Sequence, residues 1–152
     1  MTGKSDFKAD EWDVVLGGPP SAGILVATAQ RGGTFRESFS IAKAYVEARK
    51  RQGDSQLLDE IAATKPQLDH TRYHSVAELE QDALAKIRDG VAAVEAKGTP
   101  DEVEEYRKFI VGLAERVAEA HREGFLGLSG ERVSEAETEA IGKIRQAAGA
   151  ST

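Results

Sequence analysis

The stretch VVLGGPPSAGILVATAQRGGTF, from Val14 to Phe35, decides the fold, because its glycines form either a ligand loop or helix ends. A dinucleotide site requires G-x-G-x-x-G between a strand and a helix, and a P-loop requires G-x-x-x-x-G-K-S/T. Neither spacing occurs in this stretch. Both motifs also need a parallel sheet. The only segment that could be a strand, Ile24 to Val26, would have no partner strand. We therefore interpret the glycines and prolines as helix ends.

This interpretation predicts two helices in the region. The dipeptides Gly17-Gly18 and Pro19-Pro20 would separate a helix over about residues 9–16 from one over about residues 20–30. Gly32-Gly33 would end the second helix. That helix is apolar nearly all round, which is typical of a central, buried helix, and Gly23 would let a neighbouring helix approach closely.

Four further segments have the form of a capping box, in which a Ser or Thr and a Glu three residues later bond to each other's backbone amides. They are Thr34–Glu37, Ser75–Glu78, Thr99–Glu102 and Ser134–Glu137. Each precedes apolar residues at helical spacing, and a short helix capped by Asp54 is expected before Pro66. The link KGTP, residues 97–100, is so short that it predicts an antiparallel helix hairpin.

The spacing of apolar residues predicts which face of each helix is buried. The expected inward residues are Phe35, Phe39, Ala42 and Val46; Leu57, Leu58 and Ile61; Val76, Leu79, Ala83, Ile87, Val91 and Val94; Val103, Tyr106, Ile110, Leu113, Val117 and Ala120; and Ala136, Ala140, Ile141 and Ile144. The sequence thus predicts an all-α single domain over residues 1–152. We expect a compact bundle of six or seven helices, built from antiparallel hairpins around the buried apolar helix, with frayed tails at about residues 1–7 and 149–152.

Composition excludes several classes of function. The chain of 152 residues has no cysteine, so disulfides, thiolate metal sites and a cysteine nucleophile are excluded. Its formal net charge of -6 disfavours nucleic-acid binding. No apolar stretch is long enough to span a membrane, and the first residues lack the apolar region of a secretory signal, so we expect a cytoplasmic protein without a membrane partner. The basic triplet Arg49 to Arg51 would complement a helix dipole, with a phosphate contact as the alternative.

The histidines are the first candidates for chemistry. Asp69, His70 and His74 could chelate a metal if they lay on one helix face, but Pro66 and the Ser75 cap favour a solvated linker. His121 is expected to be half-buried near a helix end. The sequence has no H-E-x-x-H motif, no Glu-x-x-His pair and no nucleophile elbow. We therefore expect no catalytic residues, no metal and no cofactor.

The segment GFLGLSG, residues 124–130, places Phe125, Leu126 and Leu128 among glycines, in a connection that should be polar. In one interpretation these side chains fold back over the end of the bundle. In the other they form a surface for a protein partner or for self-association, because exposed apolar patches mark interfaces.

Two stretches, EWDVVLGGPPSAGILVATAQRGGTFRES (residues 11–38) and EGFLGLSGERVSEAE (residues 123–137), resemble a family of small all-helical bacterial proteins without an assigned activity. The lead-in to the last helix also resembles the tellurite-resistance TerB-type domains, a likeness that implies a metal-associated stress protein. The first hypothesis is a non-enzymatic interaction or accessory protein that acts through a helical surface and through Phe125, Leu126 and Leu128. A TerB-type protein is the second hypothesis, and an enzyme that uses carboxylates alone is the third.

Overall fold

The structure is a computed structural model that describes residues 2–29, 35–50, 55–66, 75–124 and 135–149. These residues form one short 3₁₀ helix and six α-helices, and they contain no strand. The elements are η1 (Lys4–Asp6), α1 (Ala9–Ala29), α2 (Phe35–Lys50), α3 (Gln56–Ala63), α4 (Val76–Lys97), α5 (Pro100–Gly124) and α6 (Glu135–Ala148). The all-α bundle predicted from the sequence is confirmed.

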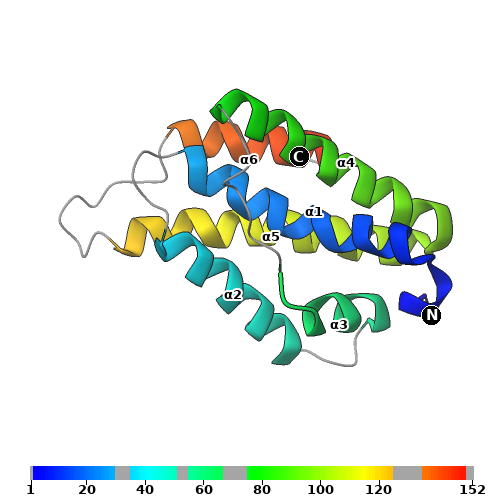
Figure 1. Cartoon of the computed structure of the whole chain (residues 1–152). Helices are drawn as coiled ribbons and strands as arrows, with labels where there is room; N and C mark the ends of the chain where they lie inside the picture. Colours follow the sequence, from blue (N-terminus) through cyan, green and yellow to red (C-terminus); the bar gives the residue numbers. More distant parts are fainter. Residues whose placement is uncertain (1, 30–34, 51–54, 67–74, 125–134, 150–152) are drawn as a thin grey trace.

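Helices α1 and α5 form the centre of the bundle (Figure 1). Helices α4 and α6 cover one side of this pair, and α2 and α3 cover the other side. The hairpin predicted at residues 97–100 joins α4 to α5. Leu25 and Val26, which belong to the apolar segment expected at the centre, are 4% and 2% exposed.

The paired glycines and prolines do not end a helix. Helix α1 is continuous from Ala9 to Ala29 and contains both Pro19 and Pro20, so the expected separation into two helices is wrong. A proline inside a helix has no N–H, and it therefore deprives the carbonyl four residues earlier of its usual donor. For Pro19 that carbonyl belongs to Val15, and for Pro20 it belongs to Leu16.

A tertiary contact replaces the donor that Pro19 lacks. The Tyr106 hydroxyl, from α5, donates a hydrogen bond of 2.6 Å to the Val15 carbonyl, and both residues are fully buried. Because a buried unpaired carbonyl is costly, this bond makes the uninterrupted helix tolerable. Local sequence rules predict a break here, and the contact from α5 overrides them.

Two glycines make room for that hydroxyl. A Cβ atom added at Gly18 of α1 or at Gly90 of α4 would lie only 2.4 Å from the Tyr106 oxygen. The hydroxyl thus occupies a slot where α1, α4 and α5 meet. Gly23 has the role expected from the sequence, since a Cβ there would lie 2.6 Å from the Ile41 side chain of α2.

The other helices agree with the sequence where their capping signals are local. Ser75 caps α4 by accepting a hydrogen bond from the Glu78 amide at 3.1 Å. At α5, Thr99 Oγ1 accepts from the Glu102 amide at 3.2 Å, and Glu102 Oε1 accepts from the Thr99 amide at 2.9 Å, so the capping box is complete. The expected inward residues of α4 and α5 whose burial is described are all buried, namely Leu79, Ala83, Ile87, Val91 and Val94, and Val103, Tyr106, Ile110, Leu113 and Val117.

Two helices present different faces from those expected. Among the α2 residues whose burial is described, 41–50, Ile41, Ala44 and Tyr45 are buried, whereas Ala42 and Val46, expected inside, are exposed. The side chains of Phe35 and Phe39, also expected inside, are not described. In α6, Ala140 and Ile144 are buried as expected, whereas Ala136 is exposed and Ile141 is only half-buried. The neighbours of each helix, which the sequence alone does not give, select the rotation.

Helix α3 begins one residue later than expected. Ser55 is its N-cap, with its hydroxyl accepting a hydrogen bond from the Leu58 amide at 3.4 Å. Asp54, expected to be the cap, lies outside the described residues, as do Gly32, Gly33, Thr34 and Ser134. Arg49 of the basic triplet donates a 2.6 Å hydrogen bond to the Ala62 carbonyl, so its guanidinium supports the end of α3.

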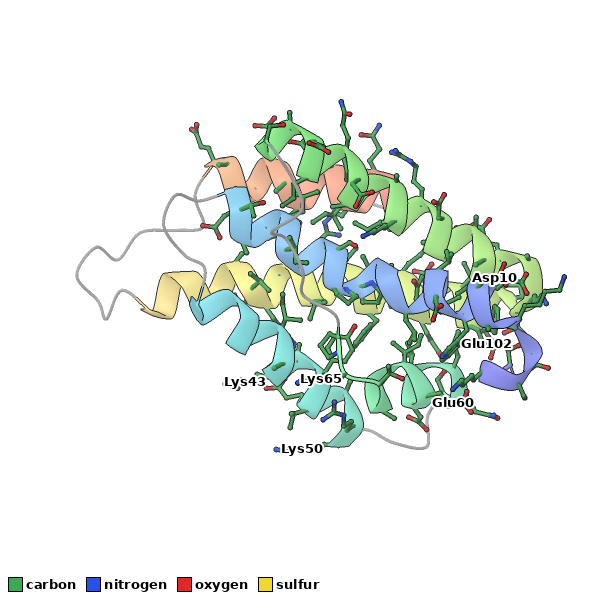
Figure 2. All side chains as sticks on the ribbon, in the orientation of Figure 1. Asp10, Lys43, Lys50, Glu60, Lys65 and Glu102 are labelled. Atoms are coloured by element: carbon green, nitrogen blue, oxygen red, sulfur yellow. The ribbon has the colours of Figure 1, made fainter. Side chains whose placement is uncertain are left out.

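The N-terminal segment is attached to the bundle, although residues 1–7 were expected to fray. The Thr2 amide donates a 2.9 Å hydrogen bond to Glu102 Oε2, and Phe7 packs against Trp12 with ring centroids 5.6 Å apart. Figure 2 shows Glu102 beside this segment. Burial alone would raise the pKa of the Glu102 carboxyl, but hydrogen bonds from Thr99 and Thr2 outweigh it and lower that pKa.

Candidate functional site

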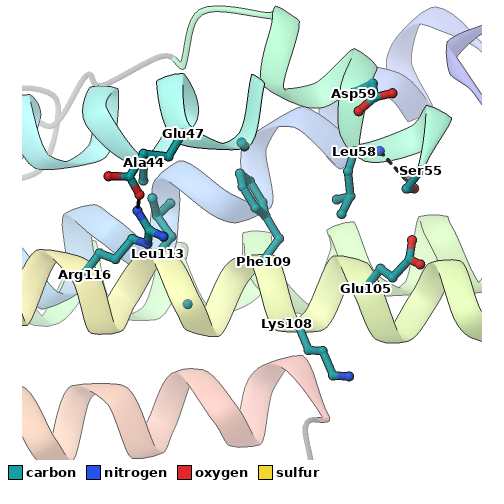
Figure 3. Close-up of a pocket in the computed structure, with 12 residues that line it drawn as sticks. Ala44, Glu47, Ser55, Leu58, Asp59, Glu105, Lys108, Phe109, Leu113 and Arg116 are labelled. Carbon is teal, nitrogen blue, oxygen red and sulfur yellow. Dashed lines mark hydrogen bonds and ion pairs between the residues drawn. The ribbon is translucent and has the colours of Figure 1, made fainter. Parts of the chain in front are cut away.

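A groove of about 380 Å³ lies where α2 and α3 meet α5 (Figure 3). We call it the α2–α3–α5 groove. It is lined by Ala44, Glu47 and Ala48 of α2; Ser55, which caps α3, with Leu58 and Asp59; and Glu105, Lys108, Phe109, Gly112, Leu113 and Arg116 of α5. Its volume lies within the range of small binding sites in proteins.

The floor of the groove is apolar. Phe109 projects from α5 towards the gap between α2 and α3, and Leu58 projects towards α5 from α3 (Figure 3). Both side chains are only partly buried, and the Phe109 ring meets Tyr45 edge-on with centroids 5.5 Å apart. The two helices α2 and α3 leave this part of α5 incompletely covered, so an apolar surface remains open between them.

Charged side chains line the edges. Glu47 of α2 forms an ion pair with Arg116 of α5 at one end. Glu105 stands at the other end beside α3 (Figure 3). Ser55 caps α3 through its hydroxyl, as described above, and it is 6% exposed. Ser55 and Glu47 therefore serve the fold, and the apolar floor is the part of the groove that is available to another molecule.

A second face of α5 explains how the groove arises. Glu105, Phe109, Gly112 and Arg116 are spaced by four, three and four residues, so they share one side of the helix. This side lies next to the buried stripe of α5. The apolar spacing predicts the stripe but not the role of this neighbouring side. An aromatic residue beside the stripe, followed by a glycine three residues later, was the signal that could have located the groove.

The candidate residues named from the sequence lie elsewhere. Phe125, Leu126 and Leu128 fall outside the described residues, and so do Asp69, His70 and His74. His121 lies within α5, but its side chain is not described. Within the described ranges, no three His, Cys, Asp or Glu side chains gather closely enough to hold a metal ion. The helices that the structure describes also include none with the length and apolar character needed to cross a membrane.

No protein-family model matches the chain, and searches of curated proteins and of solved structures found no significant match. The function therefore has to be inferred from the residues of the groove and of the surrounding helices.

Proposed function

We propose that this protein is a non-enzymatic binding protein, and that its α2–α3–α5 groove receives an amphipathic segment of a partner protein. The observation that supports the proposal is the partly buried apolar floor of Leu58 and Phe109 between charged edges. Amphipathic helices dock into grooves of this kind by inserting apolar side chains at helical spacing. An apolar floor can hold an apolar side chain of a partner, and this favours binding as the role of the groove.

The edges of the groove define the chemistry of the partner. An apolar side chain of the partner would enter between Leu58 and Phe109 and cover the exposed part of the aromatic ring. A basic residue one helical turn away would meet the Glu105 carboxylate at the α3 end. The partner segment is therefore expected to carry an apolar residue and a Lys or Arg three or four residues apart.

Two glycines allow a matched test of this proposal. A Cβ atom added at Gly112, in the groove, or at Gly142, on the exposed side of α6, meets no atom within 4 Å. A side chain can therefore be introduced at both positions, and we expect Gly112→Leu to reduce the volume of the groove and Gly142→Leu to add the same side chain away from it. Leu also favours a helix more than Gly does, so both variants should fold.

The experiment is selection of helix-forming peptides displayed on phage against the immobilised protein, followed by measurement of Kd for the enriched peptides. We expect the peptides to carry the apolar and basic pair, to bind the wild type and Gly142→Leu equally, and to bind Gly112→Leu at least about tenfold more weakly, a loss of about 1.4 kcal/mol. Glu105→Lys should weaken the same peptides while leaving the thermal unfolding temperature nearly unchanged.

Three results would contradict the proposal. The first is the absence of enriched peptides, and the second is equal binding of those peptides by the wild type and Gly112→Leu. The third is a concentration-dependent dimer in sedimentation that Gly112→Leu abolishes, because the groove would then be occupied by a second copy of this chain.

A further inference from the structure

A second cavity, of about 480 Å³, is lined by residues of α1, α2, α3 and α4 and by the residues that follow α3. We call it the Tyr45 cavity. Its apolar walls come from α1 and α3 and include Leu16, Pro20 and Ile61, and Tyr45 reaches it from α2. It is separate from the α2–α3–α5 groove, since the two share no lining residue.

Tyr45, which lines the cavity, carries an unsatisfied polar group. The residue is 1% exposed, and its hydroxyl is buried without a hydrogen-bond partner in the structure. Buried polar groups are nearly always paired, and each exception calls for an explanation such as a bound molecule. Burial also raises the pKa of the Tyr45 hydroxyl, which therefore stays protonated and can both donate and accept a hydrogen bond.

The wall formed by α1 adds a second polar feature. Leu16 and Pro20 both line the cavity, and Pro20 has no N–H to give the Leu16 carbonyl its usual helical bond. At Val15, one residue earlier, the equivalent loss is compensated by the Tyr106 hydroxyl.

We propose that the Tyr45 cavity binds a small neutral molecule with an apolar body and a hydroxyl group, and that a small movement of the Tyr45 side chain on binding brings its buried hydroxyl into hydrogen-bond contact with the ligand. An apolar interior disfavours a charged group, because an ion would lose its hydration there. The charged residues that line the cavity do not favour an anion either. They include the carboxylates of Asp13 and Asp89 as well as two lysines, one of which, Lys86, pairs with Asp82 at 3.2 Å.

Gly17 provides a way to fill the cavity. It lines the cavity, and a Cβ atom added there meets no atom within 4 Å, so a side chain can be introduced at this position and Gly17→Leu should reduce the volume of the cavity. Tyr45→Phe removes the hydroxyl and keeps the ring against Phe109. Gly142→Leu is again the matched control, because Gly142 lines neither cavity.

The test uses benzyl alcohol and cyclohexanol as probes, with benzoate and cyclohexanecarboxylate as anionic counterparts, and measures Kd from amide chemical shifts in two-dimensional NMR. We expect both alcohols to shift the amides of cavity residues in the wild type and in Gly142→Leu. Gly17→Leu should abolish these shifts, and Tyr45→Phe should raise Kd about tenfold, the equivalent of one hydrogen bond. Both carboxylates should bind more weakly than the alcohols.

The proposal is overturned if neither alcohol shifts the cavity amides, which would mean that the cavity holds only water. Equal binding by the wild type, Gly17→Leu and Tyr45→Phe would also overturn it. The circular dichroism spectrum of each variant verifies that it is folded before its Kd is compared. Because Gly17→Leu leaves the α2–α3–α5 groove unaltered, failure here would not affect peptide binding in the groove.

Discussion

Replacing Tyr106 by Phe tests how α1 continues through two prolines. The change removes one oxygen atom and keeps the ring. It deprives the Val15 carbonyl of a 2.6 Å hydrogen bond, and Pro19 has no N–H with which to replace it. An unpaired buried carbonyl costs about 1–3 kcal/mol. We therefore expect the free energy of unfolding to fall by about 2 kcal/mol, which for a domain of this size lowers Tm by roughly 4–8 °C.

The assay is denaturation in urea followed by circular dichroism, with the free energy of unfolding taken from the midpoint and the slope. A loss of unfolding free energy below about 0.5 kcal/mol would refute the reasoning, because it would show that the Val15 carbonyl does not need the Tyr106 hydroxyl as a donor. An unchanged slope is needed for the comparison, since a change in slope indicates a different denatured state.

A double-mutant cycle makes the test specific to the proline. Pro19→Ala supplies an N–H that can donate to the Val15 carbonyl, so the loss caused by Tyr106→Phe should fall below about 1 kcal/mol in that background. The cycle subtracts any effect that Pro19→Ala has by itself. An equal loss in both backgrounds would show that the hydroxyl does not substitute for the missing proline donor.

Four further predictions concern other parts of the bundle. Gly90→Ala should destabilise the wild type, because its Cβ would lie 2.4 Å from the Tyr106 oxygen, and should cost clearly less when combined with Tyr106→Phe in the same urea assay. Leu25→Ala should cost about 2–5 kcal/mol of unfolding free energy, and a loss below about 0.5 kcal/mol would show that the side chain is not in the core. Tyr45→Phe should leave that free energy unchanged or raise it by about 1 kcal/mol, because its hydroxyl has no partner; a clear loss would reveal one. Glu102→Gln should lower Tm near pH 7. Since the folded pKa of Glu102 is lowered, its contribution is present above the unfolded pKa of about 4.3 and disappears as pH falls through the folded value, so the difference in Tm should vanish in acid.

The parts of the fold that the sequence predicts are those decided within one or two helical turns. The Thr99–Glu102 capping box is an example, because both of its hydrogen bonds join residues three apart. The inward faces of α4 and α5 are another, since each helix carries a single unambiguous apolar stripe. In α2 the stripe is ambiguous, because the apolar residues Ile41, Ala42, Tyr45 and Val46 form a broad arc of the helix, and either edge of that arc could face inwards. Only contacts with α1 and α5 decide that Ile41 and Tyr45 face inwards.

The candidate sites depend on contacts between residues that are far apart in the sequence, and helical periodicity does not predict such contacts. The groove requires Leu58 of α3 and Phe109 of α5 to line the same space, and nothing in the periodicity of either helix specifies that arrangement. The continuity of α1 depends on a hydrogen bond between residues 91 positions apart. Sequence rules therefore place a helix end at the paired prolines, whereas in the fold both prolines lie inside α1.

The hydrogen-bond partners of the two buried tyrosines also cannot be predicted from the sequence. Tyr45 and Tyr106 are both almost completely buried, and burial raises the pKa of each hydroxyl. The Tyr106 hydroxyl pairs with a carbonyl that Pro19 leaves without a helical donor, so its polar group contributes to the fold. The Tyr45 hydroxyl has no such partner, and Tyr45 also lines a cavity together with Leu16 and Pro20. Pro19 thus creates a requirement that the bundle meets with its own side chain, whereas Tyr45 keeps an unpaired hydroxyl in the wall of the cavity where we propose that a small hydroxyl compound binds.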